Sequence, residues 1–287
     1  MFASFNARAV GLAGLDPEET IKIAVATGFA GVDLMVRDIV QSGVDPREVR
    51  AQLDQNGLRA GAFPFPFDWR TDEAGFLENL ARLKPILQAA QILGLTRTGT
   101  WVMPELPDRN SNRREVVALH VRRLGMIARV LAEFDIKLGL EVIGVESFRT
   151  GRGEPFVCRM GDLDRELGAI WAESPNLGIL VDAFHLYAAD ESTEAAFAWG
   201  VDRVIWVHIA DLPPDSDGAR GSIIDANRGL PGENGAVKIR GLLTRLQSEG
   251  YDGPVTVEPL SQCRSILGLE PRAVAGRVKQ SLDKVWP

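Results

Sequence analysis

The sequence contains little cysteine and no long apolar run, and each absence excludes a class of protein. Its two cysteines, Cys158 and Cys263, lie far apart without CxxC spacing among 287 residues. This argues against a disulfide framework and a thiolate metal site, and it fits a reducing compartment. No stretch approaches the roughly 18 apolar residues that span a bilayer, and the N-terminus lacks a cationic segment followed by an apolar core. We therefore expect an unprocessed, soluble, cytoplasmic protein with no membrane partner.

Positive charge is also in deficit. Lysine and arginine total 32 against 39 aspartates and glutamates, which gives a net charge of −7. This balance provides no general attraction to phosphate backbones, so nucleic acid is not an expected partner. The sequence also lacks the GxGxxG and GxxxxGK[ST] loops that bind phosphates after a first strand. A doubly wound open sheet is therefore the weaker of two interpretations of the fold.

What the sequence does have is a repeated alternation of short apolar runs and amphipathic helical segments. That alternation predicts parallel strands joined by crossover helices. The first helix is marked by Asp16 as N-cap, Pro17 at the first helical position and Gly28 at its end. Eight strand and helix pairs in 287 residues predict an α/β fold, a (β/α)8 TIM barrel that forms one domain over residues 1–287. The predicted strands are residues 2–7, 31–36, 58–65, 96–103, 137–144, 177–184, 203–210 and 253–260, and further clear helices are 114–134, 236–250 and 273–286.

Ionisable residues stand near the ends of four predicted strands, where an apolar residue is expected. They are Glu141, Asp182, His208 and Glu258. Consecutive barrel strands bring their C-terminal ends to one face, so these side chains are predicted to converge there. Two glutamates, an aspartate and a histidine form a mostly oxygen ligand set that suits Mn²⁺, Mg²⁺ or another divalent ion. A bound metal would compensate Asp182, because an unpaired buried carboxylate costs several kcal/mol.

Six motifs occur along the chain: "GFAGVDLMV", "LGLEVIG" around Glu141, "LVDAFHLY" around Asp182 and His185, "VHIADLP" around His208, "NRGLPGENG" around Arg228 and "VTVEPL" around Glu258. In this order and spacing they resemble the xylose isomerase-like sugar-phosphate isomerase/epimerase barrels, which include ketose 3-epimerases, hydroxypyruvate isomerases and inosose dehydratases. The resemblance covers nearly the whole chain. It implies that Glu141, Asp182, His208 and Glu258 bind one divalent ion (Mn²⁺, Mg²⁺, Co²⁺ or Zn²⁺) and that His185 and Arg228 contact the substrate. It also implies a homo-oligomer, by analogy with relatives.

The implied substrate is a small sugar or keto-polyol. A metal that holds a ketone oxygen acidifies the neighbouring C–H, and two carboxylates can then exchange the proton. The resemblance suggests Glu141 and Glu258 for these catalytic roles. Aromatic side chains near the predicted barrel mouth, Trp101 and Phe65 among them, are interpreted as an apolar wall around the substrate. The long loop 211–235 is predicted to be functional, because few simple connections are that long.

Each assignment has a structural alternative. Glu141 or Glu258 alone is compatible with a paired structural carboxylate, and His185 with an imidazole bonded to a backbone carbonyl. Arg228 is compatible with a solvated loop charge. His120 is interpreted as a helix-surface residue without a role. Asp211 and Glu233 are left between a supporting role and loop solvation.

Four functions compete. The favoured one is a metal-dependent isomerase or epimerase of a ketose, a polyol-derived ketone or a small hydroxy-ketone. The second is a dehydratase of the inosose or dehydroshikimate type, which begins with the same proton abstraction. The third is a catalytically inactive barrel that binds a ligand. The fourth, a nuclease of the endonuclease IV type, needs many histidines, and the sequence has only three.

Overall fold

The protein is built around one parallel sheet that curls into a barrel. The computed structural model describes residues 1–287. The nine strands follow the order β3-β2-β1-β9-β8-β7-β6-β5-β4. The strands are β1 (Phe2–Phe5), β2 (Gly31–Val32), β3 (Arg59–Ala60), β4 (Phe63–Pro64), β5 (Arg97–Val102), β6 (Lys137–Val142), β7 (Leu177–Asp182), β8 (Val204–Ile209) and β9 (Pro254–Val257).

The two edges of this sheet belong to one interrupted strand. β3 pairs with β2, β4 pairs with β5, and only residues 61 and 62 separate β3 from β4. The strand predicted over 58–65 is therefore bent into two halves, and the bend closes the ring. Counted this way the sheet has eight strand positions, and the predicted (β/α)8 barrel is confirmed.

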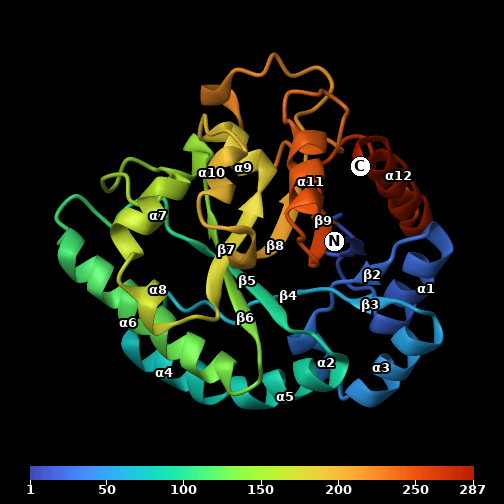
Figure 1. Cartoon of the computed structure of the whole chain (residues 1–287), viewed down its shortest axis with the longest axis horizontal. Helices are drawn as coiled ribbons and strands as arrows, with labels where there is room; N and C mark the ends of the chain where they lie inside the picture. The colour runs from blue at the N-terminus through green and yellow to red at the C-terminus, as the bar shows by residue number, and fades with distance from the viewer.

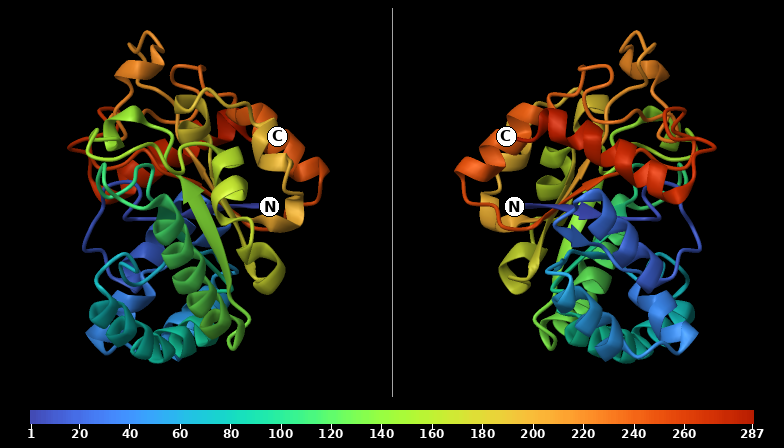
Figure 2. Two further views of the ribbon diagram at one scale, coloured as in Figure 1. Left: turned by 90° about the vertical axis from the view of Figure 1, so that its left-hand side faces the viewer. Right: turned by 90° about the vertical axis from the view of Figure 1, so that its right-hand side faces the viewer.

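Helices surround the sheet, as Figures 1 and 2 show from three directions. The predicted helix over 114–134 is α6, and its bounds agree with the prediction within two residues. None of the helices is both long enough and apolar enough to cross a membrane. The helices are α1 (Pro17–Thr27), α2 (Val36–Ser42), α3 (Pro46–Gln55), α4 (Glu73–Ala81), α5 (Leu83–Leu93), α6 (Arg113–Ala132), α7 (Met160–Leu167), α8 (Ile170–Glu173), α9 (Ala183–Ala188), α10 (Glu194–Phe197), α11 (Ile239–Ser248) and α12 (Pro271–Val285).

Local signals begin and end α1 as the sequence predicts. The Asp16 side chain accepts a hydrogen bond from the Glu19 N–H at 2.8 Å, and Pro17 is the first helical residue. Gly28 ends the helix in a left-handed conformation with φ of 76°, which glycine adopts without steric cost. The chain can therefore turn directly into β2.

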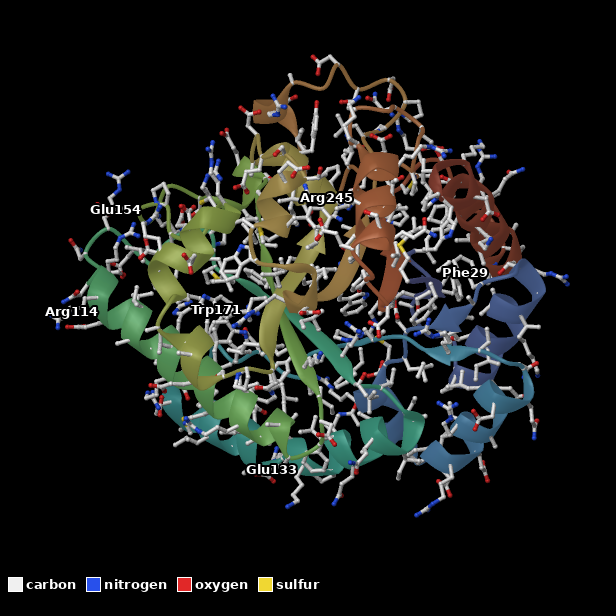
Figure 3. The ribbon with its side chains drawn as sticks, in the orientation of Figure 1. Phe29, Arg114, Glu133, Glu154, Trp171 and Arg245 are labelled. Atoms are coloured by element: carbon white, nitrogen blue, oxygen red, sulfur yellow. The ribbon has the colours of Figure 1, made fainter.

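The apolar core lies between the sheet and the helices. One connected cluster of 67 buried apolar residues joins them. In Figure 3, Arg114, Glu133 and Glu154 point outward from the rim, whereas Trp171 lies toward the interior. The loop 211–235 stands on the side toward which β7 and β8 point (Figure 1). This is the face on which barrel enzymes carry their active sites.

Candidate metal centre and active site

The four predicted metal ligands lie together at the C-terminal ends of neighbouring strands. Glu141 is in β6, Asp182 ends β7, His208 is in β8 and Glu258 directly follows β9. Asp182 and His208 are register partners. One ligand atom from each of the four side chains lies within 4.8 Å of the others. Parallel pairing alone thus brings together residues that are up to 117 positions apart in the sequence.

The chemistry of this cluster fits a divalent ion. Asp182 and His208 are buried, with 3% and 6% of their surface exposed. His208 Nδ1 is 3.1 Å from Glu258 Oε2 and 3.7 Å from Glu141 Oε1, yet neither ring nitrogen makes a well-directed hydrogen bond. A buried imidazole without partners, surrounded by three carboxylates, is a donor set that a divalent cation satisfies.

Asp182 has partners within the protein as well. Its Oδ1 accepts a hydrogen bond from the Phe184 N–H at 2.7 Å, because Asp182 also caps the N-terminus of α9. Its Oδ2 accepts one from Arg228 Nη1 at 2.8 Å. The sequence predicted that a metal compensates this carboxylate, whereas the structure also supplies a buried guanidinium and a helix cap.

Arg228 lies within the cluster and is itself buried, with 2% of its surface exposed. Besides Asp182, its Nη1 is 3.2 Å from Glu258 Oε2. Its Nη2 donates to Asp225 Oδ1 at 2.5 Å and is 3.2 Å from His185 Nε2. Burial alone would lower the pKa of Arg228, but Asp182 and the other carboxylates raise it above its ordinary value. Arg228 is therefore a permanent cation, not a solvated loop charge.

The cluster moves the pKa values of its members in different directions. Burial raises the pKa of Glu141, although His208 opposes the shift. Burial would lower the pKa of His208, but Glu258 and Glu141 raise it well above its ordinary value. Burial would raise the pKa of Glu258 and of Asp182, but His208 lowers the first and Arg228 lowers the second to about 2. Two carboxylates thus stay ionised beside one that holds its proton more readily.

A cavity of about 230 Å³ opens above these residues. Glu141, His208, Glu258 and Trp101 line it. Other cavities, of about 270, 350 and 580 Å³, are larger but include none of the four predicted ligands, so the chemistry and not the volume identifies the site.

The remaining predicted substrate contacts lie behind this cavity. His185, 4% exposed, faces Arg228 and Asp225, and its Nε2 is 3.5 Å from Asp225 Oδ1. Phe65, 9% exposed, packs against Phe67 with ring centroids 4.7 Å apart. Neither His185, Arg228 nor Phe65 lines the cavity.

Trp101 forms a rigid part of the cavity wall. The Arg70 guanidinium carbon lies 3.9 Å from the centroid of its ring, and Arg70 Nη1 donates to the Trp101 carbonyl at 2.6 Å. Phe148 meets the ring edge-on at 6.1 Å. An aromatic face held in this way can pack against the C–H groups of a sugar ring.

Two aspartates of the loop 211–235 support the site. Asp211 is fully buried, and its carboxylate accepts backbone N–H groups from Leu212 at 2.9 Å and Gly235 at 2.7 Å, which joins the two ends of the loop. This decides in favour of a supporting role for Asp211. Asp225, three residues before Arg228, was not singled out from the sequence. An acidic residue three positions before a candidate arginine was the signal available.

The interpretation of His120 as a surface residue is wrong. His120 is buried, with 6% exposed, between the rings of Trp69 at 5.0 Å and Phe156 at 5.1 Å. Its Nδ1 bonds to the Val116 carbonyl, and Nε2 has no partner. Burial lowers the pKa of His120 to about 4. Its ring therefore packs as an aromatic residue between the loops that follow β4 and β6.

Comparison with known proteins agrees with this architecture. Residues 21–283 match the family described as the xylose isomerase-like TIM barrel. The chain belongs to this family. The solved structure of a xylose isomerase domain protein from Alicyclobacillus acidocaldarius superposes on this xylose isomerase-like barrel with a TM-score of 0.85 at 26% identity, over 99% of this chain and 98% of that chain. The IolI protein, crystallised with a bound zinc atom, superposes with a TM-score of 0.80 at 17% identity, over 99% of this chain and 98% of that chain.

The named relatives of this chain are enzymes. An inosose isomerase of Halalkalibacterium halodurans is 24% identical over 65% of this barrel and 61% of its own length. A 3-dehydroshikimate dehydratase of Pseudomonas putida is 27% identical over 87% of this barrel but only 36% of its own length. The chain thus matches between about a third and about three fifths of the length of these relatives.

Proposed function

We propose that the protein is a divalent-metal-dependent isomerase or epimerase that moves a proton next to the carbonyl of a ketose, a polyol-derived ketone or a small hydroxy-ketone. The observation that carries the proposal is the cluster of Glu141, Asp182, His208 and Glu258 beneath a cavity at the C-terminal face of the barrel. The inosose isomerase relative supports it.

These four side chains would hold the ion. When bound, a divalent cation polarises the substrate carbonyl and makes the neighbouring C–H more acidic. Mn²⁺, Mg²⁺, Co²⁺ and Zn²⁺ all suit three carboxylates and one imidazole. The bound zinc of IolI supports the presence of an ion.

Glu141 and Glu258 are the proposed acid and base. Both line the cavity, so one carboxylate can remove the proton and the other can return it. The buried charge of Arg228, 3.2 Å from Glu258 Oε2, together with His208 lowers the pKa of Glu258 and so helps to keep this carboxylate ionised as the base. His185 holds Arg228 in place, Trp101 packs against the substrate, and Phe65 supports the wall from behind.

Deuterium exchange tests the reaction. The Mg²⁺-loaded protein is incubated in heavy water with ketoses, inososes and hydroxy-ketones, and NMR follows incorporation next to the carbonyl. We expect metal-dependent incorporation and an isomer or epimer as product. Glu258→Gln is expected to abolish it, and Glu105→Gln to retain it. Glu105 is a matched control because it is 7% exposed and bonds to Thr150 at 2.6 Å, outside the cavity. Exchange that survives chelation or Glu258→Gln would refute the proposal.

A dehydratase is the second candidate. Two 3-dehydroshikimate dehydratases, from Pseudomonas putida and Pseudomonas aeruginosa, match 87% of this chain at 27% and 28% identity. In this case proton removal is followed by loss of a neighbouring hydroxyl as water. Mass spectrometry of the same incubations separates the candidates, because only the dehydratase yields a product lighter by one water.

A further inference from the structure

A buried carboxylate without a counter-ion is joined by a hydrogen bond to the strand that precedes Glu258. Asp33, in the "GVDL" segment at the end of β2, is 2% exposed, and no cationic side chain bonds to it. Its Oδ1 accepts hydrogen bonds from Ser4 Oγ at 2.7 Å and from the Ala62 N–H at 2.8 Å. Its Oδ2 accepts one from Thr256 Oγ1 at 2.6 Å. Since an unpaired buried charge is costly, this position needs a reason beyond packing.

One of these bonds continues toward the metal centre. The Thr256 hydroxyl gives its only proton to Asp33, so the same oxygen can accept only at its lone pairs. It accepts the indole N–H of Trp206 at 2.8 Å. Trp206 in turn packs edge-on against His208, with ring centroids 4.4 Å apart and planes at 80°. Asp33 therefore fixes the direction of a hydrogen-bond chain that ends at Trp206, whose ring packs against the candidate metal ligand His208.

Strand periodicity explains this arrangement. Side chains two residues apart in a strand point to the same face. Thr256 precedes Glu258 by two residues, and Trp206 precedes His208 by two. Thr256 and Trp206 therefore form the layer of side chains beneath the candidate ligands. Two glycines leave room for this layer and for Asp33. A Cβ on Gly61 would lie 2.1 Å from Asp33 Oδ1, and one on Gly99 would lie 3.1 Å from the Trp206 ring.

We propose that Asp33, Thr256 and Trp206 are positioning residues that hold the His208 ring ready for a metal ion. The inference rests on the metal site of the proposed function. His208 has no well-directed hydrogen bond of its own, so its packing against Trp206 keeps the ring in place. Partners one step removed from a metal commonly change its affinity by about 10- to 100-fold.

Zinc affinity, measured by competition with a chromophoric chelator, tests the inference on the whole protein. Thr256→Val and Asp33→Asn are expected to weaken Zn²⁺ binding about 10- to 100-fold. Thr98→Val is the matched control, because Thr98 is another fully buried barrel threonine whose hydroxyl bonds to the Phe63 carbonyl at 2.8 Å. It should bind Zn²⁺ within about twofold of the wild type, since its hydroxyl has no link to Trp206.

A second measurement separates positioning from general loss of stability. The Trp206 indole N–H should exchange with solvent faster in Thr256→Val than in Thr98→Val, as followed by NMR. Zn²⁺ affinity equal to the wild type in Thr256→Val, or an equal loss in Thr98→Val, would overturn the inference alone. Failure of the wild type to bind Zn²⁺, Mn²⁺ or Mg²⁺ would overturn the proposed function together with it.

Discussion

Protonation of His120 should make the protein acid-sensitive by an amount that the structure predicts. Burial lowers the pKa of this imidazole from 6.5 to about 4, so the folded state favours the neutral ring. The stability that this provides is present above pH 6.5 and is lost as the pH falls toward 4. A difference of about 2.5 pKa units corresponds to roughly 3 kcal/mol in full, of which roughly 2 kcal/mol is lost between pH 7.5 and pH 5.

Urea unfolding of the wild type and His120→Phe at these two pH values isolates this effect. Phenylalanine keeps an aromatic ring between Trp69 and Phe156 but does not titrate. Every other group titrates in both proteins, so the wild type should lose roughly 2 kcal/mol more than the variant on acidification. His120→Gln provides a polar, neutral control that should resemble His120→Phe in its pH dependence. Equal acid sensitivity in all three proteins would refute the reasoning.

Two further predictions concern charges that hold the site together. Arg228→Met removes the partner of Asp182 and should destabilise the metal-free protein by about 3–5 kcal/mol. Addition of Zn²⁺ should then restore more stability to the variant than to the wild type. Arg245→Met, which removes the exposed pairs with Glu194 and Glu249, should cost about 1 kcal/mol or less. An equal cost for both variants in urea unfolding would contradict this prediction. Asp211→Asn should cost about 1–3 kcal/mol, because each Asp211 oxygen accepts two backbone N–H groups and the amide N–H₂ must face two of them. Unchanged stability and unchanged amide exchange at Gly235 would exclude the role of Asp211.

The sequence was sufficient to predict that the four candidate metal ligands converge. Each candidate ligand is an ionisable residue near the end of an apolar run, and the geometry of a parallel barrel brings such ends together. The interruption of the strand over 58–65 was not predicted. Its cause is tertiary, because Gly61 omits a Cβ where the carboxylate of Asp33 enters from β2.

Buried polar residues were predicted less well than apolar ones. Asp225 and Asp211 occupy a loop, where an aspartate is usually solvated, and only the folded structure shows which backbone and side-chain donors surround them. His120 was recoverable in part. It precedes Leu124 by four residues and Ile127 by seven, and both are buried, so helical periodicity places it on the inward face.

The proposed function requires one metal ion bound by Glu141, Asp182, His208 and Glu258. Isothermal titration of the chelator-treated protein with Zn²⁺ measures this, alongside His208→Ala and His120→Phe. We predict one ion per chain in the wild type and in His120→Phe, and a loss of binding in His208→Ala. Absence of binding in the wild type, or unchanged binding in His208→Ala, would contradict the central claim.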